Sequence, residues 1–355
     1  MPVETSVREG LTRWLMTLQP LRQDLQVLDV RRPQTGFSSD TLLVDVGWIS
    51  DQKPVKESMV LRLMPTEQPT VFPSYSLTHQ VRVTQALHQR GLKVPTVLGY
   101  SESSEWIGAP FYVMAQLPGR TAVENPPYHA EGWIHALPRE EQGKVWFGLM
   151  DVILALGRMD VNDGGFDFLK PTGTSRSPLQ HSLEQTRTFL RWVENQQRPL
   201  PQLHAVLDWL EHHQPGDEET VICWGDAKLG NLLFEGSTVT GALDWEGAHL
   251  GAPCSDLAWA LMLDRALSEG IGLSRIAGFP SREETLIYWR DRSGRDTHDL
   301  AYYEVFSALK FAVIMASIAR IFRHKGWIPG TSTMDSENAA TSMLKIYARE
   351  MGLTF

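Results

Sequence analysis

Four polar residues in the second half of the chain have the types that one kind of chemistry requires. Three stand in the segment WGDAKLGN, as Asp226, Lys228 and Asn231, and the fourth is Asp244 in LDWE. Phosphoryl transfer needs a carboxylate that accepts the proton of a hydroxyl, oxygen ligands for Mg²⁺, and a cation beside the transferred phosphate. We therefore predict Asp226 as the catalytic base and Lys228 as the cation. Asn231 and Asp244 are the predicted metal ligands.

The spacing of these residues supports a shared site. Asn231 follows Asp226 by five positions, as in the catalytic loop of protein kinases, where the Asp is the base and the Asn binds metal. The β-rich runs LLF and VTGAL flank the turn at 235–237, so a hairpin would return Asp244 to the side of Asn231. A single Asp in such a segment is most often a turn or capping residue, and Asp256 in SDLAWA is predicted to cap the following helix.

The first third of the chain has the pattern of strands. VLDVRRPQTGFSSDTLLVDVGWI places two β-rich runs on either side of a turn, and ESMVLRLMP predicts a third strand. A helix is expected over Leu77–Gln89, because Val81, Ala86 and Leu87 can share one face and Gly91 follows its end. VPTVLGYS and APFYVMAQL are two further strand-like runs. These elements predict a small antiparallel sheet with one helix.

After Gly119 long amphipathic stretches predominate, and only one short strand pair interrupts them. The expected helices span roughly residues 139–161, 180–196, 202–213, 300–323 and 337–350. We therefore predict an α+β, two-lobe architecture with the active site in the cleft between the lobes. Residues 1–117 would form a β-rich, nucleotide-binding lobe, and residues 118–355 a helical lobe for catalysis and substrate binding.

Composition and charge exclude several classes of protein. The 355 residues carry a formal net charge of -9, which disfavours binding to a nucleic-acid backbone. The longest apolar stretch, 311–319, is far shorter than the roughly 20 residues that span a bilayer. Two cysteines, Cys223 and Cys254, fit a reducing compartment, and the N-terminal segment lacks a signal-peptide pattern. We expect a cytoplasmic enzyme without nucleic-acid or membrane partners, either a monomer or a homodimer.

Longer motifs resemble one known family. They are WGDAKLGNLLF, GALDWEGAHLGAPCSDLAWAL, VPTVLGYSESSEWIGAPFYVMAQLPGR and TGFSSDTLLV, and together they cover about residues 20–325. The chain resembles the aminoglycoside phosphotransferase and choline kinase-like superfamily, and within it the kinase-like domains of acyl-CoA dehydrogenase fusion proteins. The resemblance implies a protein-kinase-like fold, ATP or GTP as donor, Mg²⁺ as metal, and a small-molecule hydroxyl as acceptor.

The resemblance also implies a nucleotide site in the first lobe. The segment that would bind the purine through its backbone consists of Met114, Ala115, Gln116 and Leu117. The phosphate loop would contain Gly36, Phe37, Ser38 and Ser39. Arg62 stands where the family usually has a phosphate-binding Lys, and Gln80 where the carboxylate partner of that Lys is expected. Arg and Lys bind phosphate differently, so these departures bear on nucleotide affinity.

The acceptor is less well indicated. The chain has 12 Trp, and the candidates for an acceptor site are Trp245, Glu246, Trp289 and Tyr303. The alternative for the aromatic residues is packing between helices. Aminoglycosides are polycations, and the acidic runs at 217–219 and 283–284 have the pattern of solvated surface. This favours a less charged acceptor, either a hydroxyacyl thioester or an aromatic alcohol.

Two further classes of function compete with an active kinase. Arg62 and Gln80 are compatible with a pseudokinase that binds nucleotide or a partner without turnover. A hydrolase or zinc enzyme finds no support, because the chain contains no G-x-S-x-G, H-E-x-x-H or C-x-x-C motif. Both metal ligands and the base are present, so an active kinase is the favoured function.

Overall fold

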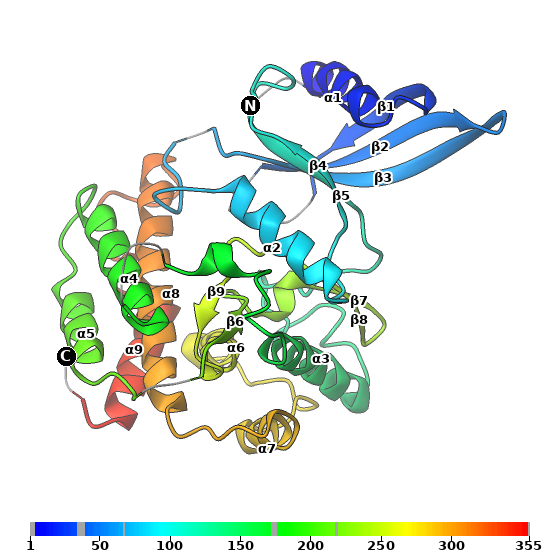
Figure 1. Cartoon of the computed structure of the whole chain (residues 1–355). Coiled ribbons are helices and arrows are strands. Elements are labelled where there is room, and N and C mark those ends of the chain that lie inside the picture. The colour runs from blue at the N-terminus through cyan, green and yellow to red at the C-terminus, as the bar shows by residue number, and fades with distance from the viewer. Residues whose placement is uncertain (1–3, 34–39, 67, 172–175, 217–218, 354–355) are drawn as a thin grey trace. The chain divides into compact units, whose positions relative to one another are not determined.

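The β-rich runs of the first third form one antiparallel sheet in the computed structural model, which describes residues 4–33, 40–66, 68–171, 176–216 and 219–353. The sheet has five strands in the order β1-β2-β3-β5-β4. The chain divides into two compact units, Met1–Thr70 with Ser74–Leu117 and Val71–Pro73 with Pro118–Phe355. The first unit contains this sheet and the second is mainly helical, so the predicted α+β class is confirmed (Figure 1). The strands are β1 (Gln23–Arg31), β2 (Asp40–Ser50), β3 (Lys53–Leu63), β4 (Val97–Ser101) and β5 (Phe111–Ala115).

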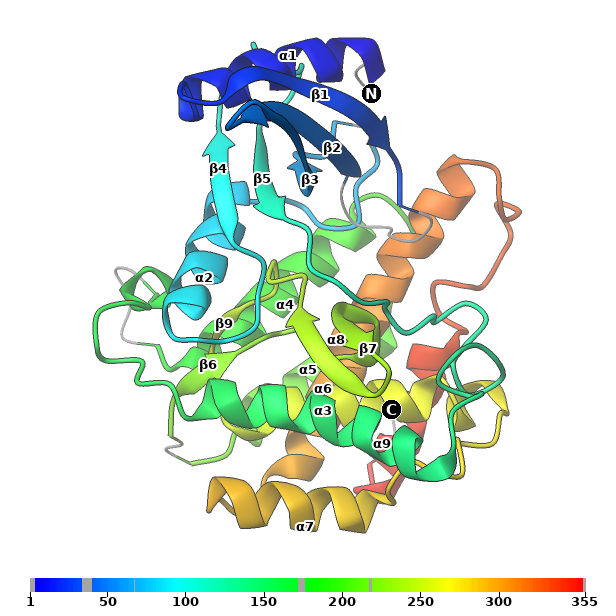
Figure 2. The same cartoon turned by 90° about the vertical axis from the view of Figure 1, so that its right-hand side faces the viewer.

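Two helices cover opposite faces of the sheet, because successive strand residues point to opposite sides. Phe111 and Val113 of β5 belong to a core cluster with helix α1 (Glu4–Leu18), whereas Tyr112 packs with helix α2 (Leu77–Gln89). Figure 2 shows α1 lying across the sheet. The predicted bounds of α2 are confirmed.

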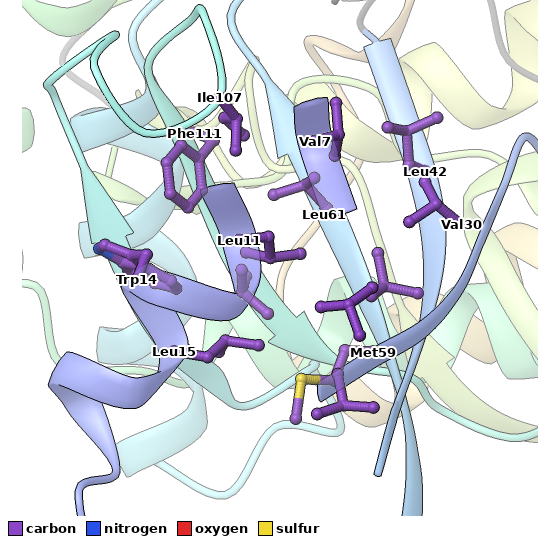
Figure 3. Packing of buried hydrophobic residues seen from close by; sticks show 14 of the residues in the cluster. Val7, Leu11, Trp14, Leu15, Val30, Leu42, Met59, Leu61, Ile107 and Phe111 are labelled. Atoms are coloured by element: carbon purple, nitrogen blue, oxygen red, sulfur yellow. The ribbon is translucent and has the colours of Figure 1, made fainter. Parts of the chain in front are cut away.

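Helix α1 was not predicted, so the expected sheet with one helix is a sheet with two. Its buried residues Val7, Leu11, Trp14 and Leu15 follow helical spacing and pack against the sheet (Figure 3). The ring of Trp14 meets Phe111 edge-on, with 4.7 Å between the ring centroids. The charged residues between these apolar positions are the polar face of an amphipathic helix, a signal that was present in the sequence.

The second unit consists of helices around two short strand pairs. Strand β6 (Val221–Cys223) pairs with β9 (His249–Gly251), and β7 (Leu232–Glu235) pairs with β8 (Thr238–Ala242). Its helices are α3 (Arg139–Gly157), α4 (Pro178–Glu194), α5 (Pro201–His212), α6 (Cys254–Ala266), α7 (Arg282–Ser293), α8 (Leu300–His324) and α9 (Ala339–Glu350), with single 3₁₀ turns η1 (Asp167–Leu169), η2 (Leu229–Asn231) and η3 (Glu269–Ile271). Helix α7, which begins with a capping box of Ser281 and Glu284, was also not predicted.

Helix α8 is the central helix of the second unit and contacts α4, α5, α6 and α9 (Figure 1). It is the one helix, within the part of the chain that the structure describes, long and apolar enough to cross a membrane. The predicted apolar stretch 311–319 lies inside this helix, between Lys310 and Arg320. However, 61% of the apolar window is buried inside the protein, as in the core helix of a folded unit.

Candidate active site

The predicted catalytic segment follows strand β6 in the second unit. Gly225 has φ +84°, and a Cβ atom there would lie 2.0 Å from the carbonyl oxygen of Gly247. Only glycine satisfies both conditions, since it adopts the left-handed region without a side-chain clash. This close approach joins the segment of Asp226 to the loop that follows Asp244.

Both carboxylate oxygens of Asp226 accept hydrogen bonds. The indole Nε1 of Trp259 donates to Oδ1 over 3.0 Å, and the amide Nδ2 of Asn231 donates to Oδ2 over 2.8 Å. The same amide nitrogen donates to the backbone carbonyl of Asp226 over 3.0 Å. Trp259, from α6, was not among the predicted site residues. These bonds orient the carboxylate of a partly exposed residue, as a general base requires.

Lys228 lies between two carboxylates. Its Nζ is 3.4 Å from Oδ2 of Asp226 and 3.3 Å from Oε2 of Glu124. Burial opposes the charge of this ammonium group, but the nearby carboxylates, chiefly Asp226 and then Glu124, outweigh burial and raise the pKa of Lys228 well above its usual range. Asp244 contributes in the same direction. Lys228 is therefore a permanent cation beside the candidate base.

Glu124 was missed by the sequence analysis. It lies 104 positions before Lys228, in a segment between the first unit and α3 that carries no catalytic motif. Burial raises the pKa of the Glu124 carboxyl, and its Oε1 atom is buried without a hydrogen-bond partner among the described residues. A Cβ atom at Gly230 would lie 2.5 Å from this Oε1, so the chain passes close to the carboxylate where a glycine stands.

The predicted hairpin is present and returns the chain from Asn231 to Asp244. Leu232 pairs with Ala242 across β7 and β8, and the N–H of Leu243 donates to the carbonyl of Asn231 over 2.9 Å. Asp244 has φ +60°, a left-handed conformation that Asp and Asn tolerate better than other non-glycine residues. Such strained backbone is concentrated at functional sites.

Two stacked indole rings hold the backbone at Asp244. Nε1 of Trp224 donates to the carbonyls of Leu243, over 2.9 Å, and Asp244, over 3.2 Å. The ring of Trp224 stacks on Trp245 with 5.0 Å between centroids. The indole donor of Trp224 therefore fixes the turn that carries a predicted metal ligand.

Asp256 binds the backbone of the segment that precedes Asp226, and its predicted role as a helix cap is wrong. The residue lies in the first turn of α6, whose N-cap is Pro253. Its carboxylate instead accepts the backbone N–H groups of Trp224, over 2.6 Å, and Gly225, over 2.9 Å. Burial raises the pKa of Asp256 to about 6. The carboxylate satisfies two N–H groups that would otherwise be unpaired inside the protein.

The candidate acceptor residues have different surroundings. Trp245 and Trp289 are 3% and 2% exposed, respectively, so both side chains pack in the interior. Interior packing was the alternative to a role in acceptor binding that the sequence left open for the aromatic residues. Glu246 is partly exposed and follows the strained turn. Tyr303 of α8 is buried beside Tyr302 and lines a pocket together with Lys310.

The predicted nucleotide-binding residues of the first unit are partly described. Arg62 of β3 stands opposite Tyr112 in β5, on the face that α2 covers. Gln80 of α2 accepts a hydrogen bond from the Tyr112 hydroxyl over 3.2 Å. The predicted phosphate loop, Gly36, Phe37, Ser38 and Ser39, lies outside the described residues.

The predicted purine-binding segment begins inside the sheet. The N–H of Ala115 donates to the carbonyl of Thr96, and the N–H of Gln116 donates to that of Ser58. Met114 pairs with Val60 across the sheet. The N–H of Leu117 has no hydrogen-bond partner within the residues that the structure describes, so this end of the segment could bind a ligand.

A family model described as "Phosphotransferase enzyme family" matches residues 29–287. The chain belongs to this phosphotransferase family. The match covers most of both units and all four predicted catalytic and metal-binding residues. The predicted family relationship is confirmed.

Solved structures of this phosphotransferase family support the kinase-like fold. A putative aminoglycoside phosphotransferase from Ralstonia eutropha JMP134 has a TM-score of 0.71 and 22% identity, over 96% of this chain and 98% of that chain. A mutant aminoglycoside phosphotransferase in a ternary complex with ADP and hygromycin B has a TM-score of 0.57 and 14% identity, over 97% of this chain and 100% of that chain. At these identities the comparison shows the shared fold.

Relatives named for a different activity contain a similar region. Acyl-CoA dehydrogenase family member 11 of Rattus norvegicus is 26% identical over 297 residues, which are 80% of this chain and 35% of that protein. The chain thus spans about a third of the length of this curated relative. The rest of that relative lies outside the match.

Proposed function

We propose that the protein is a magnesium-dependent small-molecule kinase that transfers the γ-phosphate of ATP or GTP to a hydroxyl group. One observation carries the proposal: Asp226 is oriented through both oxygens, with the Lys228 ammonium group 3.4 Å from one of them. This arrangement combines a base and a cation in one place, as phosphoryl transfer requires. Family membership supports the class of reaction.

Asn231 and Asp244 are the proposed metal ligands. They offer an amide oxygen and a carboxylate, hard oxygen donors of the kind that Mg²⁺ prefers. Across the described chain, no group of three or more His, Cys, Asp or Glu side chains could hold a metal ion. Mg²⁺ is commonly bound through one or two carboxylates and keeps several waters and substrate phosphates as its other ligands. When bound, the metal would neutralise charge on the phosphate oxygens.

The proposed reaction assigns the remaining roles to the residues of this chain. Asp226 accepts the proton of the acceptor hydroxyl, whose oxygen forms a bond to the γ-phosphorus. The bond from that phosphorus to the bridging oxygen breaks, and the nucleoside diphosphate leaves with the bonding electrons. Lys228 balances the negative charge of the transferred group. Glu124 and Asp226 keep Lys228 charged and in place.

The nucleotide roles of the first unit are part of the proposal. Arg62 would bind donor phosphates, and the backbone between Met114 and Leu117 would bind the purine. Gln80 is hydrogen-bonded to Tyr112 and supplies an amide where the family is expected to have a carboxylate, which favours the pseudokinase as a second candidate. A cytoplasmic location and the absence of nucleic-acid and membrane partners stay predictions from sequence.

The acceptor is proposed to be a hydroxyacyl thioester or an aromatic alcohol. The acyl-CoA dehydrogenase relatives support the thioester, because a kinase-like region beside such an enzyme would act on related molecules. Fold and family do not determine the substrate, so an assay of both acceptor classes is the direct test.

The first test is ADP release from ATP and Mg²⁺ with panels of aminoglycosides, hydroxyacyl thioesters and aromatic alcohols. The Asp226→Asn variant keeps the shape of the side chain but loses the base, so we expect turnover to fall by roughly 10²- to 10⁴-fold. Equal thermal unfolding of the two proteins is the control for folding. Near-normal turnover by the variant would refute Asp226 as the base. ATP binding without turnover by the wild type would support the pseudokinase.

A further inference from the structure

The two oxygen atoms of the Asp226 carboxylate have unequal surroundings. Oδ2 faces two nitrogen donors, Nδ2 of Asn231 at 2.8 Å and Nζ of Lys228 at 3.4 Å. Oδ1 accepts one hydrogen bond, from Nε1 of Trp259 at 3.0 Å, and has no second partner in the part of the chain that the structure describes. Each carboxylate oxygen has two lone pairs. Both lone pairs of Oδ2 therefore face donors, whereas Oδ1 keeps one that is open.

This difference decides which oxygen can act as the base. A proton that approached Oδ2 would meet the positive charge of Lys228 and the amide of Asn231. Oδ1 has an open lone pair, and the Asp226 side chain is 30% exposed, so a hydroxyl from outside the protein can reach the carboxylate. A general base must lie within hydrogen-bond reach of the proton that it removes. Oδ1 is the oxygen that meets this condition without displacing a partner.

The donor at Oδ1 is itself held in place. Trp259 is buried on α6, and two residues of α8 contact its indole. The ring of Phe311 meets the indole edge-on, with 6.2 Å between the centroids, and Nζ of Lys310 lies 5.3 Å from the centroid of the indole ring. A fixed donor restricts rotation of the Asp226 carboxylate, so the open lone pair of Oδ1 keeps one direction.

We propose that Trp259 is a positioning residue for the base and that Oδ1 of Asp226 receives the proton of the acceptor hydroxyl. The inference rests on the proposed kinase function and assigns the atom at which its proton transfer occurs. The O–H bond of the acceptor breaks, and its proton bonds to Oδ1. The hydroxyl oxygen keeps the electron pair and forms the bond to the γ-phosphorus, from which the nucleoside diphosphate leaves. Trp259 keeps its own proton and acts only through Asp226.

Two substitutions separate the hydrogen bond of Trp259 from its bulk. Trp259→Phe keeps a six-membered aromatic ring but has no N–H. Trp259→His keeps a five-membered ring whose Nε2 can stand in the place of the indole Nε1, and it loses bulk. The kcat should fall by about 10- to 100-fold in Trp259→Phe, the loss of one hydrogen bond to a charged group, and by much less in Trp259→His. A role in packing alone predicts the reverse order, because Phe fills apolar surroundings better than His.

The KM for ATP gives a second readout. It should be nearly unchanged in both variants, because the hydrogen bond to Asp226 acts on the reacting groups and not on binding of the nucleotide. Trp146→Phe and Trp146→His are the matched control pair. Trp146 of α3 is fully buried, and its Nε1 donates to the Thr285 hydroxyl over 2.9 Å. Both control changes should lower the Tm and keep kcat near the wild-type value, because this hydrogen bond involves no residue of the candidate site.

The outcomes separate the inference from the proposed function. Normal kcat in a folded Trp259→Phe protein, or equal losses in Trp259→Phe and Trp259→His, would overturn the positioning role. If Trp259→Phe fails to fold, β-(3-benzothienyl)alanine at position 259 keeps the shape of the indole with sulfur in place of the N–H, and normal kcat with that residue would overturn the inference as well.

Failure of the proposed function has a different signature. A wild type without turnover of any acceptor, or an Asp226→Asn variant with normal turnover, would refute the base and the inference with it. Loss of turnover in Asp226→Asn together with normal kcat in the Trp259 variants would refute the inference and leave the kinase standing.

Discussion

At the scale of single residues, the candidate site depends on how carboxylates are shared around Lys228. Oδ2 of Asp226 receives the Asn231 amide at 2.8 Å and lies 3.4 Å from the Lys228 ammonium group. Oε2 of Glu124 lies 3.3 Å from Nζ of Lys228 and attracts the same ammonium group. A base that is paired too tightly with a cation would lose basicity. We infer that Glu124 keeps Lys228 from closing fully onto Asp226.

Glu124→Gln tests this positioning role. Loss of its charge should tighten the pairing of Lys228 with Asp226 and reduce kcat by roughly tenfold. The KM for ATP and the thermal unfolding of the variant should change little, which a purely structural role of Glu124 would not leave intact. Glu131→Gln, in the same segment but exposed, is the control. A lower kcat accompanied by an equal loss of thermal stability would argue against the positioning role.

The residues differ in how far the sequence reveals them. Asp226, Lys228 and Asn231 are close in sequence, so their spacing predicts them as a set. Glu124 and Trp259 join the same site from distant segments, and their contacts depend on tertiary packing that a single sequence does not encode locally. No pattern at Glu124 distinguishes it from a loop carboxylate, whereas Trp259 lies in the family motif without a predicted role.

At the scale of elements, the site is held by close approaches between loops of the second unit. Gly225 and Gly236 both have positive φ, +84° and +61°, but only Gly225 has a neighbour where a Cβ atom would lie. Substitutions at these two glycines therefore separate the effect of the left-handed backbone conformation from the effect of a steric clash. Each Gly→Ala change carries the cost of the left-handed conformation, about 1–2 kcal/mol.

Gly225→Ala should displace the Asp226 segment, because the new Cβ atom would overlap the carbonyl of Gly247. We expect loss of at least about 10²-fold in kcat, since small misplacements of catalytic groups are costly. Gly236→Ala should lower the free energy of unfolding by about 1–2 kcal/mol and keep kcat. Denaturant unfolding and ADP release measure the two effects. A Gly225→Ala protein with normal kcat would show that the loop contact is dispensable.

Asp256 makes the second unit sensitive to pH. Its pKa is raised from 3.8 to about 6, so the folded state binds its proton more tightly than the unfolded state. This contribution to stability is complete below about pH 4 and is lost as the pH rises through about 6. The shift corresponds to a loss on the order of 3 kcal/mol, with each pKa unit worth about 1.4 kcal/mol.

Asp256→Asn removes this titration. Between about pH 4 and pH 7 the free energy of unfolding should fall in the wild type through this titration and not in the variant. The variant should still be less stable than the wild type at every pH, because Asn accepts only one of the two N–H groups well. The measured quantity is the difference in free energy of unfolding between the two proteins at each pH. A constant difference over this range would contradict a raised pKa.

Element boundaries show what periodicity can and cannot predict. The bounds of α2 and the hairpin of β7 and β8 were predicted from the sequence, because apolar spacing and turn residues agree there. Helix α7 was not predicted, since few of its residues are buried and its apolar pattern is weak. Asp256 was assigned as a cap because the sequence cannot show that its carboxylate turns toward another loop.

At the scale of the whole molecule, the two units contribute differently to the family assignment. The family match spans both units, and Arg62 and Gln80 of the first unit are the residues where the resemblance led us to expect Lys and a carboxylate. The second unit keeps the four predicted catalytic and metal-binding residues. Nucleotide binding is therefore the property that Arg62 and Gln80 would affect, whereas turnover separates the proposed kinase from the pseudokinase alternative.

Thermal unfolding with ATP and Mg²⁺ measures that property. A ligand that binds only the folded protein stabilises it by about 2.7 kcal/mol at 100 times its Kd, so Tm should rise by several degrees. Chelation of magnesium should remove most of the rise. Asp244→Asn should do the same, because Asn tolerates the left-handed backbone at φ +60° but lacks the charged oxygen that binds the metal.

Asp51→Asn is the matched control for this variant, since Asp51 also has positive φ, 49°, but is exposed in the turn between β2 and β3. It should keep the full magnesium-dependent rise in Tm. If Asp244→Asn kept it as well, the metal would have to be held by other groups, and the assignment of Asp244 would be wrong. If the wild type showed no rise with ATP at any magnesium concentration, the proposed kinase function would be refuted, and a pseudokinase that binds a partner in place of nucleotide would be favoured.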